Sequence, residues 1–358
     1  MRFVINNDKL ASALAVIAKT ISTRPTQPGY MAIRVAVKDD GQLMLKGTDG
    51  ESTTLFSTKV SDFEAGEVAV TGPLFADIAK DLPKGDVTFK FENNQVSIVA
   101  KSGKYKLPVI NELPPIVEPT IDSGVKLNGP AFSAAINSVV SVTRGAEGVY
   151  NAVKLEKVEN KLRLVATDRY RLGYAEVSTE NQDEWDVDVL IPGKIITDVA
   201  KTFAKANTVT LNATAGSFTI GDGEVTLVTR VASGTFPAYK AILEKERLGS
   251  LSVKTEDLLA TIKRVSKFSS NSATPTSVKL SFAENKLTVT SGNTDDASET
   301  LDFTGTISPI EIFANSNYLM DALAGTSSEN ALIAPTGTSS ALFIEGVYKH
   351  LVMPTKGL

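Results

Sequence analysis

The chain has 358 residues, with 37 Lys and Arg against 41 Asp and Glu, and a formal net charge of −4. It has no cysteine and a single histidine, His350, which excludes disulfides, thiolate metal sites and two-histidine zinc motifs. No apolar stretch approaches the roughly eighteen residues of a membrane helix, and residues 1–8 lack the apolar run of a signal peptide. We therefore expect a cytoplasmic globular protein that needs no metal ion and no cofactor.

In chain order, the sequence predicts a short β-type stretch, an amphipathic helix, alternating runs, a second helix and further alternating runs, three times over. Alternation such as that of residues 278–282 is typical of antiparallel strands with one face on a core. Asn7 or Asp8 is expected to cap the first helix. Because strands outnumber helices and connections are short, the predicted fold class is α+β, with two helices on antiparallel sheets in each repeat. The helices are expected at residues 8–20, 74–82, 130–142, 193–205, 256–268 and 316–324.

Two landmarks recur with a period of about 120 residues, a leucine in an alternating run and an aspartate in the second helix. They are Leu43, Leu162 and Leu287, and Asp77, Asp198 and Asp321. A period of this length is that of a domain rather than of a solenoid repeat. We therefore expect three domains, at residues 1–121, 122–247 and 248–358.

No phosphate-binding loop, dinucleotide fingerprint or nucleophile elbow occurs in the sequence, so nothing in it indicates an enzyme. Thr167-Asp168 repeats Thr48-Asp49, which favours a structural turn in which a neighbouring arginine pairs with Asp168. The Arg-Tyr-Arg sequence at 169–171 has no counterpart in the other repeats and needs a separate explanation.

Two further candidates for chemistry remain. The carboxylates of Asp295, Asp296 and Glu299 could hold a divalent cation, although a solvated turn is the favoured interpretation. His350 precedes apolar residues, and we expect it at an edge position rather than in a catalytic one.

The expected helices carry nine basic and seven acidic residues, whereas the rest of the chain is net acidic. Several of the acids lie at helix N-termini, where capping explains them. Lysines therefore dominate the exposed helix faces. Ordinary solvated helices and a weakly basic surface for nucleic acid both remain open as interpretations.

Five segments carry a resemblance to a known family. Residues 22–28 read Ser-Thr-Arg-Pro-Thr-Gln-Pro, 47–49 Gly-Thr-Asp, 165–172 Val-Ala-Thr-Asp-Arg-Tyr-Arg-Leu, 234–239 Gly-Thr-Phe-Pro-Ala-Tyr, and 351–354 Leu-Val-Met-Pro. In this order they resemble the bacterial β sliding clamps, the beta (processivity) subunits of DNA polymerase III, and the similarity runs over the whole chain. The resemblance implies three clamp domains and an accessory subunit without catalytic activity of its own.

The resemblance also implies partners. Two chains would close head to tail into a homodimeric ring around duplex DNA, whose sequence the ring does not read. A peptide-binding pocket would dock the polymerase alpha subunit, the clamp loader, other polymerases and repair proteins at the nucleoid. Twelve helices spaced roughly 9–10 Å apart would line a hole of about 35 Å, wider than a duplex of about 20 Å.

Three sets of residues follow from the resemblance. The DNA-binding residues would be Arg24, Arg144, Lys194, Lys201, Lys205, Arg264 and Lys267. The peptide pocket would be formed by Tyr150, Thr167, Tyr170, Arg171, Leu172, Pro237, Ile242, Tyr318, Ala341, Leu351, Met353 and Pro354. The dimer interface would contain Leu107, Val109, Phe268, Leu301 and Phe303.

The chain departs from the family pattern at a few positions. Tyr170 stands where many relatives have histidine, and residues 353–358 lack a second apolar residue and an arginine that are common there. These departures concern peptide preference rather than the fold. Two alternatives remain: a DNA-binding scaffold protein that forms no ring, and a hydrolase that uses Asp168 or the pair Asp295 and Asp296 as its acid.

Overall fold

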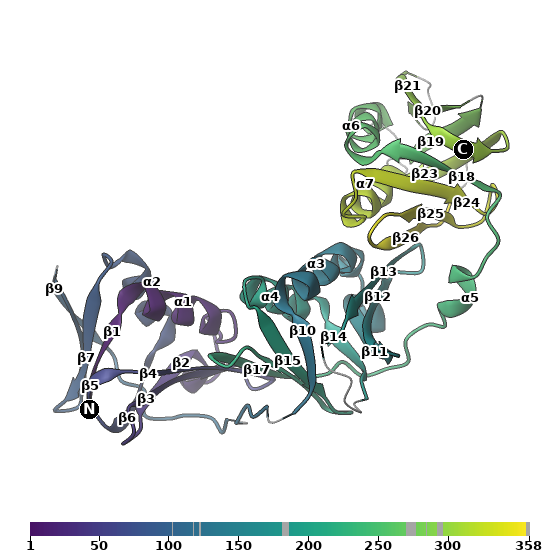
Figure 1. The fold of residues 1–358 in the computed structure, drawn as a ribbon. Coiled ribbons are helices and arrows are strands. Elements are labelled where there is room, and N and C mark those ends of the chain that lie inside the picture. Colours follow the sequence, from purple (N-terminus) through teal and green to yellow (C-terminus); the bar gives the residue numbers. More distant parts are fainter. Residues whose placement is uncertain are drawn as a thin grey trace. The chain divides into compact units, whose positions relative to one another are not determined.

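The computed structural model describes residues 1–101, 103–116, 118–121, 123–180, 186–269, 277–283, 285–291 and 296–355 (Figure 1). By its contacts the chain divides into two compact units. The first unit comprises Met1–Gly129, Glu180–Val187 and Lys205–Val231, and the second comprises Pro130–Thr179, Asp188–Ala204 and Ala232–Leu358. The middle repeat thus contributes strands to both units.

The first unit contains two antiparallel sheets and the helices α1 (Asn7–Ile17) and α2 (Gly72–Asp81), which lie side by side. The five-stranded sheet has the order β5 (Ser61–Glu64), β1 (Arg2–Asn6), β7 (Asp86–Glu92), β8 (Gln95–Ala100) and β9 (Gly103–Leu107). The eight-stranded sheet has the order β10 (Val125–Asn128), β15 (Thr208–Ala213), β16 (Ser217–Gly221), β17 (Val225–Arg230), β4 (Ser52–Lys59), β3 (Gln42–Thr48), β2 (Ala32–Val37) and β6 (Gly66–Thr71).

The second unit is built in the same way. Its helices are α3 (Gly129–Val139), α4 (Gly193–Phe203), the single-turn α5 (Lys240–Leu243), α6 (Thr255–Val265) and α7 (Ser316–Gly325). The nine-stranded sheet has the order β14 (Asp188–Pro192), β11 (Ala152–Val158), β12 (Lys161–Thr167), β13 (Arg171–Ser178), β26 (Lys349–Val352), β25 (Leu342–Glu345), β24 (Asn330–Pro335), β18 (Gly249–Lys254) and β22 (Thr304–Ile307). The four-stranded sheet has the order β21 (Ser298–Asp302), β20 (Lys286–Ser291), β19 (Ser277–Ala283) and β23 (Ile310–Asn315).

The apolar stripes of the helices build the cores against these sheets. On α1, Leu10, Leu14 and Ile17 are fully buried and belong to one cluster with Phe3 and Phe89, whose rings stack at 4.9 Å. Leucine and isoleucine that recur at helical spacing give an apolar stripe, and packing this stripe against the sheet removes it from water. The predicted α+β class is confirmed.

All six expected helices are present, with ends that differ by a few residues. The stretches expected at 130–142 and 256–268 are α-helical only as far as Val139 and Val265. Their last turns are 3₁₀ helices, η2 (Val140–Thr143) and η4 (Ser266–Ser269). Helix ends commonly tighten in this way, and hydrophobic periodicity does not report it.

The expected cap of the first helix is wrong by one residue. Asn6 is the N-cap, and its side-chain oxygen accepts a hydrogen bond from the backbone N–H of Asp8 at 3.0 Å. Asn7 is buried, and its side-chain amide donates to the carbonyl oxygens of Ala79 and Leu82, each at 3.0 Å. Asn7, which was expected to cap α1, instead links α1 to Ala79 in α2 and to Leu82, the residue that follows α2.

The expectation of an edge position for His350 is also wrong. His350 lies on β26, which pairs with β13 on one side and β25 on the other, and its side chain is 2% exposed. The pairing of β13 with β26 joins segments far apart in the sequence, and a local pattern carries no information on it. This pairing places Leu172 opposite Leu351 and so positions the site described next.

Candidate functional site

An apolar pocket of about 250 Å³ lies in the second unit. Its lining is mostly carbon, with a few polar groups at the rim, as in sites that bind apolar side chains. We call it the apolar pocket; it is lined by Tyr150, Thr167, Arg169, Arg171, Leu172, Pro237, Ala238, Tyr239, Ile242, Leu351 and Met353.

Several elements bring these residues together. Thr167 and Leu172 face each other where β12 and β13 meet, and Leu351 is the partner of Leu172 on β26. Tyr150 comes from the 3₁₀ helix η3 (Gly148–Asn151), and Ile242 from α5. The pocket therefore joins residues of the middle repeat to the last strand of the chain.

Most of the residues assigned to a peptide pocket by resemblance line this cavity: Tyr150, Thr167, Arg171, Leu172, Pro237, Ile242, Leu351 and Met353. Ala341 is fully buried, in a cluster with Leu172 and Leu351, so it supports the floor without facing the cavity. Tyr170 and Tyr318 line a neighbouring cavity instead, and Pro354 lines neither of the two.

Three lining residues lie outside the set that the resemblance assigned to the pocket: Arg169, Ala238 and Tyr239. Tyr239 belongs to the Phe-Pro-Ala-Tyr segment that carried the resemblance, and its hydroxyl hydrogen-bonds to Glu156. Burial and this hydrogen bond raise the pKa of Tyr239, so the phenol stays protonated. Arg163 also donates to the Tyr239 hydroxyl, at 3.3 Å, so two side chains fix this wall of the pocket.

The neighbouring cavity, of about 420 Å³, is polar, and we call it the polar cavity. Tyr150, Arg169 and Arg171 line both cavities, so the two adjoin. The polar cavity is lined by Arg144, Gly145, Ala146, Glu147, Tyr150, Asp168, Arg169, Tyr170, Arg171 and Tyr318.

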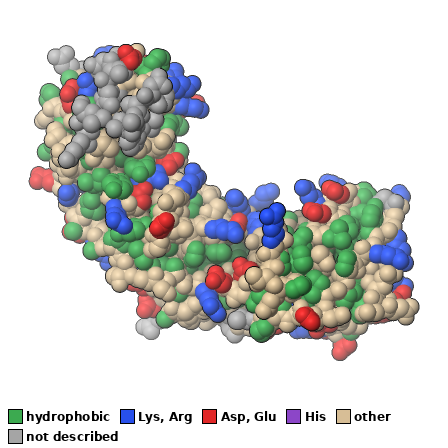
Figure 2. All heavy atoms as spheres, turned by 180° about the vertical axis from the view of Figure 1, so that it is seen from behind, with side chains coloured by type: hydrophobic (Ala, Val, Ile, Leu, Met, Phe, Trp, Pro, Cys, Tyr) green, Lys and Arg blue, Asp and Glu red, His purple; other side chains and the backbone are tan. Residues whose placement is uncertain are grey.

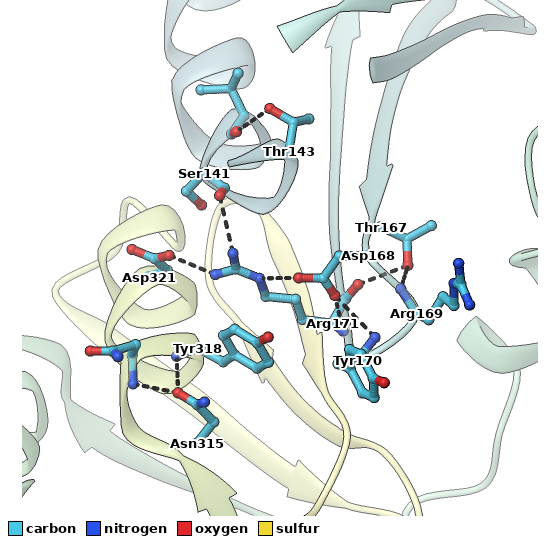
Figure 3. Close-up of polar contacts among 12 residues, drawn as sticks. Ser141, Thr143, Thr167, Asp168, Arg169, Tyr170, Arg171, Asn315, Tyr318 and Asp321 are labelled. Atoms are coloured by element: carbon cyan, nitrogen blue, oxygen red, sulfur yellow. Dashed lines mark hydrogen bonds and ion pairs between the residues drawn. The ribbon is translucent and has the colours of Figure 1, made fainter. Parts of the chain in front are cut away.

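Arg171 is the structural centre of this region (Figure 3). Its Nε donates to Asp168 Oδ2 at 2.8 Å, its Nη1 to Asp321 Oδ2 at 2.6 Å, and its Nη2 to the carbonyl oxygen of Ser141 at 3.2 Å. The guanidinium also lies 4.3 Å from the centroid of the Tyr318 ring. The expected pairing of Asp168 with a neighbouring arginine is confirmed. Arg171 thereby ties the β12–β13 turn to α7 and to η2.

The turn between β12 and β13 repeats a turn of the first unit. Asp168 Oδ1 accepts from the backbone N–H groups of Tyr170 and Arg171, as Asp49 Oδ1 accepts from those of Glu51 and Ser52. The hydroxyls of Thr167 and Thr48 complete the two turns by donating to the carbonyl oxygens of Arg171 and Ser52. The third Thr-Asp pair, at 294–295, lies outside the described residues.

The two turns differ in one residue that matters. The residue after the aspartate has a positive φ in both turns, +93° at Gly50 and +79° at Arg169. A side chain in this left-handed conformation costs roughly 1–2 kcal/mol, which glycine avoids. Arginine at this position therefore stores backbone strain next to the two cavities, where a functional reason is to be sought.

The residues assigned to DNA are all exposed. Lys194 and Lys201 are seven positions apart on α4 and so share a helix face. Arg264 is held by Glu299 in a two-pronged ion pair, with Nη2 to Oε2 at 2.5 Å and Nε to Oε1 at 2.8 Å. Glu299 is thus an ion-pair partner, and Asp295 of the suggested acidic cluster lies outside the described residues.

Charges of both signs are mixed on the face of the molecule that Figure 2 draws. Figure 2 shows Lys and Arg side chains in separate groups with Asp and Glu side chains between them. Among the described residues, none of the helices has the length and apolarity to span a bilayer, and no three His, Asp or Glu side chains converge as metal ligands.

The chain repeats a domain of two helices on antiparallel sheets, and the apolar pocket lies between strands of two repeats. This combination defines the class of the DNA sliding clamps. Three family models match in succession: the N-terminal domain of the DNA polymerase III beta subunit at residues 1–114, the central domain at 126–238 and the C-terminal domain at 240–356. The chain belongs to the DNA polymerase III beta subunit family. It is an accessory subunit that gives a replicative polymerase processivity, and not a catalytic subunit, which rules out the hydrolase alternative.

Individual relatives agree with this assignment. The chain is 28% identical to the beta sliding clamp of Streptomyces coelicolor and 26% identical to the beta sliding clamp homolog GriR of Streptomyces muensis, over 99% of each chain. Its fold is similar to that of the Pseudomonas aeruginosa DnaN sliding clamp bound to griselimycin, with a TM-score of 0.91, 22% identity and 99% of both chains covered. It is also similar to the Bacillus subtilis clamp, with a TM-score of 0.89, 20% identity and full coverage of both chains.

Proposed function

We propose that two copies of this chain close head to tail into a ring around duplex DNA, and that the apolar pocket docks peptide segments of the proteins that use the ring. These partners would be the polymerase alpha subunit, the clamp loader, other polymerases and repair proteins, acting at the nucleoid in the cytoplasm. The observation that carries the proposal is the apolar pocket itself, because residues from distant segments, assigned by resemblance, converge on one cavity of suitable chemistry.

Ring closure would use the outer strands. β9 ends the five-stranded sheet and pairs with β8, and β21 ends the four-stranded sheet and pairs with β20. The outer backbone groups of such strands suit pairing with a second chain. We propose that β9 of one copy pairs with β21 of the other.

The assigned interface residues divide into two groups by their burial. Leu107 and Phe303 are 3% and 7% exposed and pack in the cores of their own sheets. Phe268 is 55% exposed, and Val109 and Leu301 are half-buried. The apolar contact between copies would therefore come from Phe268, Val109 and Leu301, with Leu107 and Phe303 supporting it from below.

Binding to DNA would be topological and independent of sequence. Arg24, Arg144, Lys194, Lys201, Lys205, Arg264 and Lys267 would contact phosphates, partly through water. Arg264 would do so with its charge already neutralised in part by Glu299. A ring held by closure rather than by a strong basic patch can slide.

We also propose the domain limits 1–121, 122–247 and 248–358. Both boundaries fall outside helices and strands, between β9 and β10 and between α5 and β18. A linker of this kind is where domains of about 120 residues normally meet.

Retention on circular DNA tests the ring. Clamps loaded by a clamp loader onto a nicked circular plasmid should stay on it during gel filtration and should leave once the plasmid is cut to a linear form. Native mass spectrometry should give twice the chain mass. Equal retention on circular and linear DNA, with a monomeric mass, would instead support the scaffold alternative.

A further inference from the structure

The wall shared by the apolar pocket and the polar cavity contains two arginines with different surroundings. Arg171 is 8% exposed, and its guanidinium is bound to Asp168, Asp321 and the carbonyl oxygen of Ser141 (Figure 3). Arg169 is exposed, and within the described residues its guanidinium forms no ion pair; it lies 4.7 Å from the centroid of the Tyr150 ring. The N–H groups of Arg171 are therefore used to hold the fold together, whereas the guanidinium N–H groups of Arg169 can bind a ligand.

The charged side chains that line the polar cavity favour the binding of an anion. The lining carries three guanidinium groups, those of Arg144, Arg169 and Arg171, against the carboxylates of Asp168 and Glu147, and Asp168 is ion-paired with Arg171. Arg144 lines the same cavity, is exposed and, like Arg169, has no carboxylate partner among the residues that the structure describes. Glu147 is the remaining acid in the lining, against two available guanidinium groups. A single carboxylate entering the cavity would meet a net positive surface.

The backbone at Arg169 gives an independent reason to assign it a role. The matching turn of the first unit is built with the same threonine and aspartate hydrogen bonds and has Gly50 in place of arginine. The turn therefore does not need a side chain here, and the left-handed conformation disfavours one. The guanidinium, stacked on Tyr150, is placed where the two cavities meet.

We propose that Arg169 determines peptide specificity: it binds the carboxylate of an acidic side chain in a peptide whose apolar side chains fill the apolar pocket. This deepens the proposed docking function and rests on it. The acidic side chain enters the polar cavity and pairs with Arg169, whose guanidinium lies over the ring of Tyr150, a residue that lines both cavities. A planar guanidinium can hold a carboxylate with two parallel hydrogen bonds, which gives selectivity for geometry as well as for charge.

A peptide carboxylate is favoured over a DNA phosphate as the occupant because the polar cavity adjoins the apolar pocket, in which a peptide would be anchored. Tyr150, Arg169 and Arg171 line both cavities, so a chain anchored in the apolar pocket reaches the polar cavity within a few residues. The lining of the apolar pocket is mostly apolar, which suits apolar side chains better than a nucleic-acid backbone. A role for Arg169 in duplex binding is therefore an outcome that the test has to distinguish.

The test uses the full-length protein and labelled nonapeptides that carry two adjacent large apolar residues. A single aspartate is moved through the remaining positions, and a matched set carries asparagine instead. For at least one position, the wild-type protein should bind the aspartate peptide about tenfold more tightly than its asparagine partner. The ratio should shrink at about 0.5 M salt, because screening weakens a partly exposed charge pair.

Three variants and a control identify the residue responsible. In Arg169→Gln and in Arg169→Gly, which relieves the backbone strain, the ratio of the two affinities should fall to about one, whatever the affinity of the asparagine peptide becomes. Arg169→Lys should keep part of the ratio, since it keeps the charge but loses the two-pronged geometry. Lys254→Gln, which removes an exposed charge outside both cavities, should leave the ratio as in the wild type.

A ratio of one at every position in the wild type, or a ratio that survives Arg169→Gln, would overturn the assignment while leaving peptide docking intact. If neither peptide set binds the wild type, the docking function itself fails, and the specificity role fails with it. Loss of duplex binding in Arg169→Gln with an unchanged peptide ratio would assign the residue to DNA instead.

Discussion

Leu172 on β13 and Leu351 on β26 lie opposite each other across an antiparallel strand pair, and both side chains line the apolar pocket. They are 5% and 2% exposed and belong to the same buried cluster. The floor of the pocket is thus also the core that joins the middle and C-terminal repeats. Changes at the floor alter stability and binding together, so binding is better probed at the rim.

Met353 is the rim residue of choice for peptide binding. It is half-buried and follows β26, with its backbone N–H held by the Tyr170 carbonyl oxygen at 2.7 Å, a bond that substitution does not remove. Met353→Ala should weaken binding of a polymerase tail peptide about tenfold, because part of the apolar wall is lost. Fluorescence anisotropy measures this. Met44→Ala, half-buried in the first unit, should leave the affinity as it is; equal loss in both variants would contradict the pocket assignment.

Asp321 should matter for stability as the partner of Arg171. Asp321→Ala removes the carboxylate from Arg171 Nη1, and the free energy of unfolding should fall by about 1–2 kcal/mol, a value reduced because Asp321 is one-third exposed. The repeat offers a matched control: Asp198 occupies the corresponding place on α4. Asp198→Ala should change unfolding by no more than about 0.5 kcal/mol in urea titrations. Equal effects would mean that the ion pair with Arg171 contributes nothing measurable.

His350 should make stability depend on pH. Burial lowers the pKa of His350 to about 4, with the Gly325 backbone and Asp321 opposing the shift and Arg171 adding to it. Between about pH 6.5 and 4, His350 is protonated in the unfolded chain but stays neutral in the folded chain. Stability from this group is therefore complete above about pH 6.5 and declines by about 3 kcal/mol as the pH falls to 4.

His350→Gln should remove this dependence. Thermal unfolding of the wild type and the variant, compared at about pH 7.5 and 4.5, should show a smaller loss of midpoint temperature in the variant, because glutamine does not titrate. Parallel losses in the two proteins would exclude His350 as the cause.

Val109 should decide whether the ring closes. Val109→Glu places a charge beside the outer strand β9, where contact with a second chain is proposed, and burying an unpaired carboxylate there is costly. Light scattering should show the mass moving from two chains toward one. Val347→Glu, at a position that is 68% exposed, serves as the control and should keep the wild-type mass.

The sequence predicted what is local. Helical periodicity located α1 through Leu10, Leu14 and Ile17, and the Thr-Asp repeat predicted the turn at Asp168 correctly. The burial of His350 and the meeting of Leu172 with Leu351 depend on strands paired over a long sequence separation, which no local pattern encodes. Arg169 was noticed as part of an unrepeated segment, but its positive φ and its contact with Tyr150 emerge only in three dimensions.

The pairing of β13 with β26 has a consequence for how the chain is made. In the strand register Arg171 lies opposite Val352, so the nine-stranded sheet stays incomplete on the ribosome until residues 349–352 have emerged. The five-stranded sheet, in contrast, needs only residues up to Leu107. During synthesis β13 is an uncovered strand edge beside an unfinished apolar floor, and such surfaces are prone to aggregation. Nascent chains stalled before residue 349 should therefore be the ones that need chaperones most.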